Sequence, residues 1–307
     1  MNSDTAGASG AGPVNVGTLS RIMFRHEVLR GYTLLAPALL IMLLAILLPF
    51  ILMIVMSFWD QVGFDFDTTP TLQNYREIAE KPIYSALLLR SLWVSGTATL
   101  ATVIICYPMA YFVAFHVHRN KMLWLIIITL PFWTSYLMRI FSWKVILGYE
   151  GVINSGLMSI GLIDAPLDFL IYSPGAVTIT LAHTWAAFAL LPIYVSLEKI
   201  DRSVLEAAAD LGDSPMARFF RITLPLSMPG VIAAVFLMFI PTVGDYVTPT
   251  LVGGPDGAMI GNLLQVQFGG VNNWPMGAAI AVVMVLAITA LGLCFMLLTA
   301  LFRRWAA

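Results

Sequence analysis

The chain has 307 residues, of which 59% are hydrophobic and 11% are charged, with 16 Lys and Arg against 17 Asp and Glu and a net charge of −1. Soluble domains carry about a quarter charged residues, so this composition excludes a soluble globular protein. The balanced charge provides no basic field of the kind that binds nucleic acid, and no nucleic-acid partner is expected.

Six apolar runs are long enough to cross a membrane as helices. A bilayer core of about 30 Å requires about 20 apolar residues in helical form. Such runs lie near residues 32–57, 91–115, 122–147, 174–197, 229–251 and 276–302. The first run follows three arginines, as in a signal peptide, but it is too long for the apolar region of one. The sequence therefore predicts an all-α integral membrane protein with six transmembrane helices, surrounded by lipid, over residues 31–307, after a tail of residues 1–30.

Basic residues gather in alternate loops, and this pattern predicts the orientation. One side holds Arg21, Arg25, Arg30, Arg119, Lys121, Lys199, Arg202, Arg218, Arg221, Arg303 and Arg304. The other side has only Arg76, Lys81 and Arg90, and the segments 148–173 and 252–275 have no Lys or Arg. By the positive-inside rule both termini are cytoplasmic. The outer segments are acidic instead, which indicates either a solvated face or an electrostatic funnel for a cation.

The two cysteines, Cys106 and Cys294, each lie inside an apolar run. A thiol there behaves as a small hydrophobic group, and two cysteines are too few for a disulfide framework or a cysteine-based zinc site. Both are therefore interpreted as packing residues, and no metal site is predicted.

The cytoplasmic loop 198–228, between spans four and five, contains the signals of two short helices. Ser203 and Glu206 form a capping box, which predicts a first helix that starts at Val204 and ends at Gly212. Ser214 caps a second helix that starts at Pro215, and Pro225 ends it. Apolar side chains lie along one face of each helix, namely Val204, Ala208 and Leu211, then Met216, Phe219 and Phe220. Either the bilayer and the protein's own helix bundle or another protein must cover them.

Span five contains an acidic residue between helix-breaking residues. Pro241, Gly244 and Pro249 surround Asp245, so the helix is expected to break there, and broken membrane helices line cavities or lie buried in protein. Counting from Pro229 places Asp245 roughly 24 Å along the span, towards the outer leaflet.

A carboxylate at that depth requires a partner. Arg139, at similar depth in span three, and a cationic substrate are the two candidates. Four aromatic residues, Trp133, Tyr136, Trp185 and Tyr246, could offer cation–π faces to an alkylammonium chain, or could serve as packing residues and interfacial anchors.

One long motif resembles a known family. Glu206-Ala207-Ala208, three residues, Gly212, nine residues, then Ile222-x-Leu224-Pro225 matches the EAA signature of the permease subunits of bacterial ATP-binding cassette (ABC) importers at every defined position. The resemblance implies a type I ABC importer-like permease fold in a bacterial inner membrane, whose loop docks in a groove of a separate ATPase. The docking residues it implies are Glu206, Ala207, Ala208, Leu211, Gly212, Phe219, Phe220, Ile222, Leu224 and Pro225.

The chain itself has no phosphate-binding loop. The sequence Gly-x4-Gly-Lys-Ser/Thr does not occur, so neither ATP hydrolysis nor any catalytic residue is assigned to this chain. ATP and Mg²⁺ are expected on the partner. The family resemblance implies an assembly with a pair of ATPase subunits, a second, homologous permease and an extracytoplasmic solute-binding protein.

Within that family the chain is most similar to the spermidine and putrescine permeases. The similarity is clearest at 131–136, 139–143, 151–154, 211–212, 253–256, 260–261 and 273–275. It implies a polyamine substrate, with Asp245, Tyr246, Arg139, Trp133, Tyr136 and Trp185 as the candidate path or gate. Permeases for opines, amino-acid derivatives and other small metabolites share much of the pattern and remain an alternative. A passive channel would have no use for the EAA loop, and the spans carry no motif of an integral-membrane enzyme.

Overall fold

The computed structural model describes residues 27–306. The chain divides into a unit that ends at Val55 and a second unit that begins at Met56. The first unit contains α2 (Glu27–Met56) except for its last residue, and the segment of this helix from Leu34 to Met56 has no charged residue and is long enough to span a membrane. This helix matches the first predicted span. Residues 1–26 of the predicted tail lie outside the described part of the chain.

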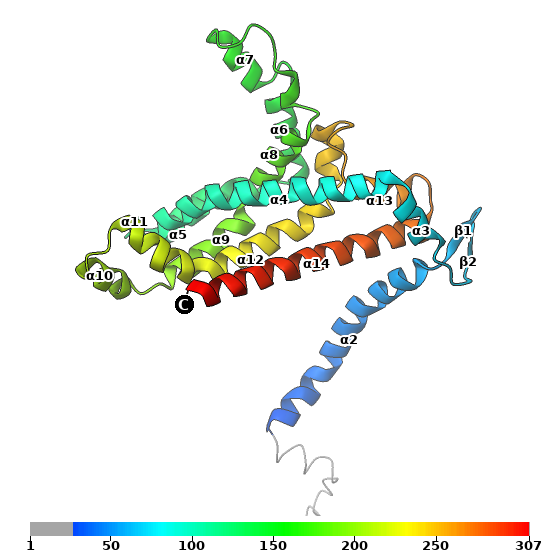
Figure 1. Cartoon of the computed structure of the whole chain (residues 1–307), viewed down its shortest axis with the longest axis horizontal. Coiled ribbons are helices and arrows are strands. Elements are labelled where there is room, and N and C mark those ends of the chain that lie inside the picture. Colours follow the sequence, from blue (N-terminus) through cyan, green and yellow to red (C-terminus); the bar gives the residue numbers. More distant parts are fainter. Residues whose placement is uncertain (1–26, 307) are drawn as a thin grey trace, which may run out of the picture. The chain divides into compact units, whose positions relative to one another are not determined.

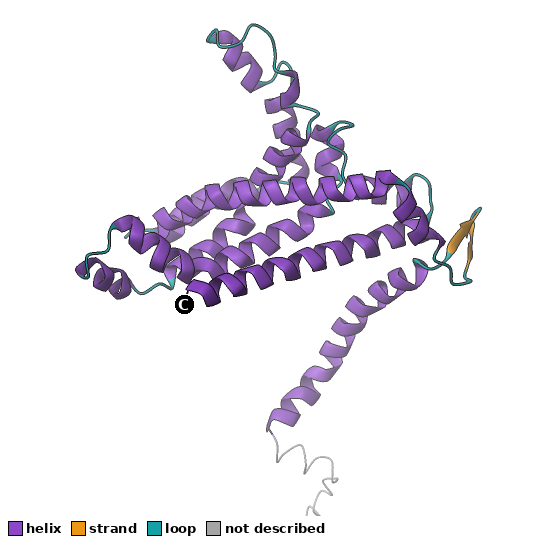
Figure 2. Ribbon diagram, viewed as in Figure 1, coloured by secondary structure: helices purple, strands orange, loops and turns teal. Residues whose placement is uncertain are grey.

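The second unit begins with a short antiparallel hairpin, β1 (Asp60–Val62) and β2 (Asp65–Asp67), in which Asp60 pairs with Asp67 (Figure 2). The helix α3 (Gln73–Glu80) precedes α4 (Pro82–Tyr111), which continues through the π-helical turn η1 (Phe112–His116). The span predicted at 91–115 therefore begins nine residues earlier, because Pro82 occupies the first position of the helix, where its missing N–H is harmless.

The third and fourth predicted spans are each broken into two helical parts. The third consists of α5 (Lys121–Thr129) with the 3-10 turn η2 (Leu130–Trp133), followed by α6 (Tyr136–Leu147) and α7 (Val152–Ser159), and the two parts meet at 82°. After the 3-10 turn η3 (Asp168–Leu170), the fourth consists of α8 (Pro174–Thr184) and α9 (Ala186–Glu198), which meet at 48°. Four helices of the described residues are long and apolar enough to span a membrane, and six spans result if each bent pair counts as one.

The loop 198–228 forms the two expected helices, with two differences. The first helix, α10, covers Arg202–Asp210, and its cap is Asp201, whose carboxylate accepts a hydrogen bond from the Ser203 amide at 3.0 Å. The predicted Ser203–Glu206 capping box is therefore wrong. Gly212 ends α10 as expected, at φ +89°, and the Asp213 amide donates to the Ala208 carbonyl in a Schellman motif.

The second helix does not end at Pro225. Ser214 caps α11 (Pro215–Arg218) as expected, but the π-helical turn η4 (Phe219–Thr223) carries the chain directly into α12 (Leu224–Val243). A wide π turn can accommodate a proline ring that an α-helical turn would not. Span five is therefore a helix of 29 residues, Pro215–Val243, rather than the predicted 229–251.

The chain ends with the π-helical turn η5 (Pro249–Gly253), α13 (Ile260–Gly269) and α14 (Trp274–Ala306), the last of which contains the sixth predicted span. In the second unit, α9 packs against both α4 and α12 (Figure 1). The buried core there comes from one face of each helix, including Tyr107 and Ala110 of α4, Leu190 and Ile193 of α9, and Ala234 of α12. A second core, around Val177, Leu181 and Met238, lies under the break in span five.

Candidate functional site: a cavity at two helix breaks

The break in span five is built around the Asp245 carboxylate. The helix α12 ends at Val243, and helical geometry resumes at Val247. Asp245 Oδ1 accepts hydrogen bonds from the backbone amides of Val247 at 2.9 Å and Thr248 at 3.3 Å. Asp245 is thus the N-cap of the helical segment after the break, which explains why the chain leaves the helix at the residue that the sequence indicated.

The second carboxylate oxygen is held by two hydroxyl groups. Asp245 Oδ2 accepts from Tyr136 Oη at 2.5 Å and from Thr248 Oγ1 at 2.6 Å, and Asp245 is only 8% exposed. With two donors on each oxygen, the carboxylate is satisfied by the protein's own groups. Thr248 has a sequence signal that was missed, because a hydroxyl residue three positions after an N-cap lies beside the capping carboxylate.

Arg139 does not pair with Asp245 in this structure. Among the described residues the ion pairs are Lys81–Glu77, Lys121–Glu198 and Arg221–Asp213. Arg139 Nη1 instead donates to the Phe132 carbonyl at 2.9 Å, and its guanidinium lies 5.5 Å from the centre of the Phe132 ring. Carbonyls at the end of a helical segment lack intrahelical partners, so the bend after η2 gives the arginine a nearer acceptor than Asp245.

Five of the six residues predicted for the substrate path line one open cavity of about 470 Å³. They are Tyr136, Arg139, Trp185, Asp245 and Tyr246, and the rest of the wall consists of Thr184, Phe188, Pro241, Gly244 and Val247. Phe188 was missed, although it lies three residues after Trp185 and so on the same helical face. Trp133 is the exception, because it lies on η2, is 74% exposed and is not part of the wall.

The cavity wall contains buried polar atoms that lack a partner among the described residues. They are Arg139 Nε, Trp185 Nε1 and Thr184 Oγ1. The Tyr136 and Trp185 rings lie beside one another, with centroids 6.3 Å apart. The cavity therefore combines hydrogen-bond donors and aromatic faces with a carboxylate that is already fully bonded.

The backbone at the break is enclosed by α13. Asn262 Nδ2 donates to the Tyr246 carbonyl at 3.0 Å, so this carbonyl at the break already has a partner within the protein. A side chain at Gly261 would lie 2.6 Å from the Gly244 carbonyl oxygen and 2.7 Å from that of Asp245. Only glycine therefore allows α13 to pack this closely against the break.

The loop 198–228 exposes only part of its apolar surface. Leu211 is 88% exposed, and Val204, Met216 and Phe220 are also exposed. Ala208 is buried, and Phe219 packs edge-on against Tyr107 and Tyr111 of α4. The predicted docking set is thus divided between an exposed face and the bundle. Of its other members, Glu206, Ala207, Gly212 and Pro225 are exposed, and Ile222 and Leu224 are half-buried.

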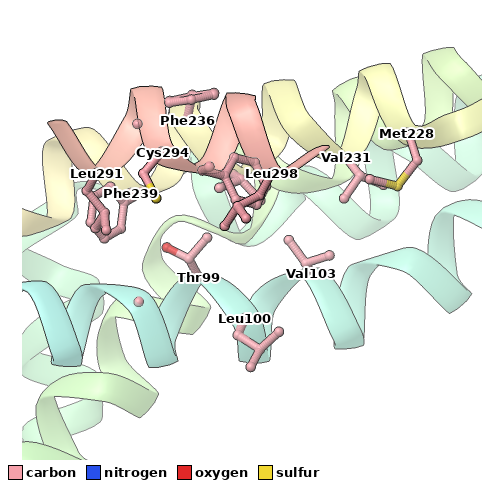
Figure 3. Close-up of a pocket in the computed structure, with 14 residues that line it drawn as sticks. Thr99, Leu100, Val103, Met228, Val231, Phe236, Phe239, Leu291, Cys294 and Leu298 are labelled. Atoms are coloured by element: carbon pink, nitrogen blue, oxygen red, sulfur yellow. The ribbon is translucent and has the colours of Figure 1, made fainter. Parts of the chain in front are cut away.

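A second cavity of about 480 Å³ lies between α4, α12 and α14 (Figure 3). Its wall is apolar apart from the Thr99 hydroxyl and the Cys294 thiol, so it does not offer a site for a polar solute. The two cysteines differ, since Cys106 is buried as expected, whereas Cys294 is exposed on α14 and lines this cavity.

Residues 38–307 match the family described as binding-protein-dependent transport system inner membrane component. The spermidine/putrescine transport system permease protein PotB of Escherichia coli (strain K12) is 40% identical over 212 residues, 69% of this chain and 76% of that protein. PotB of Haemophilus influenzae is 37% identical over 238 residues, 77% of this chain and 82% of that protein. The inner membrane ABC transporter permease protein YdcU of Escherichia coli (strain K12) is 33% identical over 245 residues, 76% of this chain and 78% of that protein.

The fold also matches solved structures. A chain of a bacterial ABC transporter involved in the import of the acidic polysaccharide alginate superposes with a TM-score of 0.67 and 17% identity, covering 90% of this chain and 96% of that one. A chain of the alginate transporter in complex with an alginate pentasaccharide-bound periplasmic protein gives a TM-score of 0.68, also at 17% identity, covering 90% of this chain and 95% of that one. At this identity the likeness establishes the fold.

Proposed function

The chain belongs to the family of binding-protein-dependent transport system inner membrane components, and from this premise we propose that it carries polyamines as one permease subunit of an ATP-driven importer. It is a multi-pass inner-membrane protein with the type I ABC importer permease fold, and it is a transport subunit rather than an enzyme. Spermidine and putrescine are the proposed substrates, and alternating access is the proposed mechanism.

The observation that carries the substrate proposal is the cavity at the two helix breaks. A polyamine is an alkyl chain with an ammonium group at each end. The cavity places the Asp245 carboxylate beside the Tyr136 and Trp185 rings, and a carboxylate with aromatic faces is the combination that recognises an alkylammonium group. The PotB relatives, which are 37–40% identical, are spermidine/putrescine transport system permeases and support the same substrate class.

The unpaired donors of the same cavity favour a second candidate substrate. Arg139 Nε and Trp185 Nε1 would suit the carboxylate of an opine or amino-acid derivative better than an amine. This alternative keeps the importer and changes only the solute.

Three kinds of partner belong to the proposal. The exposed face of Val204, Leu211, Met216 and Phe220 is the proposed contact with an ATPase subunit, where the EAA motif lies. A pair of ATPases, a second homologous permease and an extracytoplasmic solute-binding protein would complete the assembly, with ATP and Mg²⁺ on the ATPases. The distribution of basic residues supports cytoplasmic termini.

ATP turnover by the complex in liposomes, with its binding protein, tests the substrate. Spermidine and putrescine are expected to stimulate turnover, whereas a neutral and an anionic metabolite are not. Stimulation by an opine or amino-acid derivative alone would replace the polyamine by the second candidate. No stimulation by any solute, with all subunits present, would refute the importer assignment.

A further inference from the structure

We propose that the Tyr136 hydroxyl and the substrate's ammonium group bind to the same oxygen of Asp245. Tyr136 donates to this oxygen when no substrate is present, and the ammonium group replaces it during transport. This inference rests on the proposed polyamine function and adds a specificity-determining residue to it. When the amine displaces Tyr136, it also breaks the hydrogen bond between α6 and the break in span five.

The Tyr136–Asp245 hydrogen bond joins two interrupted spans. Tyr136 is the first residue of α6, directly after the 82° bend, and Asp245 lies in the break that follows α12. The bond between Tyr136 Oη and Asp245 Oδ2 measures 2.5 Å. A change at this one contact therefore affects the relative position of both broken segments.

Of the four hydrogen bonds to the Asp245 side chain, only that of Tyr136 comes from another span. The Val247 and Thr248 amides and the Thr248 hydroxyl all belong to the helical segment that Asp245 caps. Removing any of those three weakens the cap itself, whereas Tyr136 can leave while the cap remains intact. Oδ2 is thus the position at which a donor can be exchanged without unwinding the helix.

An ammonium group is the donor best suited to replace the hydroxyl. The Tyr136 hydroxyl is a neutral donor, whereas an ammonium group adds the attraction between two opposite charges to its hydrogen bond with the Asp245 carboxylate. Asp245 and Arg139 are the charged groups of the cavity wall, so a cation that enters gains only at Asp245 and is repelled by Arg139. The displaced Tyr136 ring and the Trp185 ring remain in the wall, where both can face the alkyl chain.

The test uses the complete importer in liposomes, with ATP turnover measured in the absence and presence of spermidine and its binding protein. Tyr136→Phe removes one oxygen and keeps the ring. Since a hydrogen bond to a charged group is lost, turnover without spermidine is expected to rise roughly tenfold. Spermidine should then stimulate the variant much less than the wild type.

Two variants act as controls. Thr248→Val removes the other hydroxyl from the same Oδ2 atom, and with it a 3.1 Å contact with Tyr136 Oη, but leaves the hydrogen bond from Tyr136 to Asp245, so turnover without spermidine should stay low and stimulation should remain. Asp245→Asn keeps one capping oxygen but replaces the charged Oδ2 acceptor by an amide NH2 group, so spermidine should no longer stimulate turnover. The amount of complex and its melting temperature are compared for all variants, because a folding defect would lower turnover rather than raise it.

The outcomes separate the two proposals. If spermidine stimulates the wild type and Tyr136→Phe behaves like it, or if Thr248→Val raises turnover as much as Tyr136→Phe does, the role of Tyr136 is refuted and the polyamine function stands. If spermidine does not stimulate the wild type but another solute does, the polyamine function fails, and the exchange of Tyr136 for an amine fails with it.

Discussion

The turn at Gly212 allows the proposed contact with an ATPase to be tested without altering any side-chain contact within the chain. Gly212 lies at φ +89°, and a methyl group added there would meet no atom within 4 Å. Gly212→Ala therefore changes only the cost of the left-handed backbone. That cost is about 1–2 kcal/mol for an L-residue with a side chain, which corresponds to a factor of roughly 5–30 in the population of the turn.

The turn fixes how α10 and α11 lie relative to each other, since the Gly212 and Asp213 amides donate to the Ala209 and Ala208 carbonyls. If the exposed loop docks on the ATPase, Gly212→Ala should weaken the binding of that subunit by up to about 30-fold. The assay is titration of the purified permease complex in detergent with ATPase subunit. Gly212→Asn serves as the matched control, because asparagine tolerates the left-handed conformation, and it should bind almost as tightly as the wild type.

Two results would refute this reasoning. Wild-type affinity for Gly212→Ala would show that the turn does not set the docking geometry. Equal losses in Gly212→Ala and Gly212→Asn would show that any side chain at this position is harmful, for instance by direct contact with the ATPase, and not that the backbone conformation matters.

Three further expectations concern the helix break and the loop. Gly261→Ala should destabilise the complex by about 1–3 kcal/mol, because the added methyl group overpacks against the Gly244 carbonyl, and should therefore lower its melting temperature. An unchanged melting temperature would contradict the close approach of α13. Leu211→Asp should abolish ATPase binding without changing the stability of the permease. Phe219→Ala empties the space beside Tyr107 and Tyr111 and should destabilise the permease by up to about 3 kcal/mol. The reverse pattern would mean that Phe219 docks on the ATPase and Leu211 packs in the bundle. Asp201→Ala removes the acceptor of the Ser203 amide and should speed hydrogen exchange at that amide. Ser203→Ala keeps the backbone amide and its acceptor, so exchange at position 203 should stay slow. Because the Ser203 amide lowers the pKa of Asp201, this protection is complete above the ordinary aspartate pKa and is lost as the pH falls through the lowered one.

The features that local sequence rules govern could be predicted. Two prolines and a glycine around Asp245 indicated the break in span five, and Gly212 and Ser214 indicated the turn between the loop helices. Each of these depends on the conformational limits of one or two residues. The cavity was largely predictable for a similar reason, since aromatic and charged residues inside apolar runs are few.

The features that depend on packing between distant segments could not be predicted. Whether Pro225 ends a helix depends on the π turn before it, where Phe219 packs against α4. Counting residues along spans three and five placed Arg139 and Asp245 at similar depth in the membrane. The bend before α6 nevertheless directs the arginine to the Phe132 carbonyl. The sequence pattern predicted the cap of the first loop helix at Ser203, but the backbone is extended at Asp201, and the carboxylate there accepts from the Ser203 amide.

The π turn at Phe219–Thr223 has a mechanical consequence. Because it joins α11 to α12 without a gap, residues 215–243 form a single rod, roughly 43 Å long at 1.5 Å per residue. One end of the rod carries Met216 and Phe220, and the other ends beside Asp245. A tilt imposed on the end with Met216 and Phe220 is therefore transmitted by the helix itself to the cavity wall at Pro241 and Gly244, with no flexible loop in between.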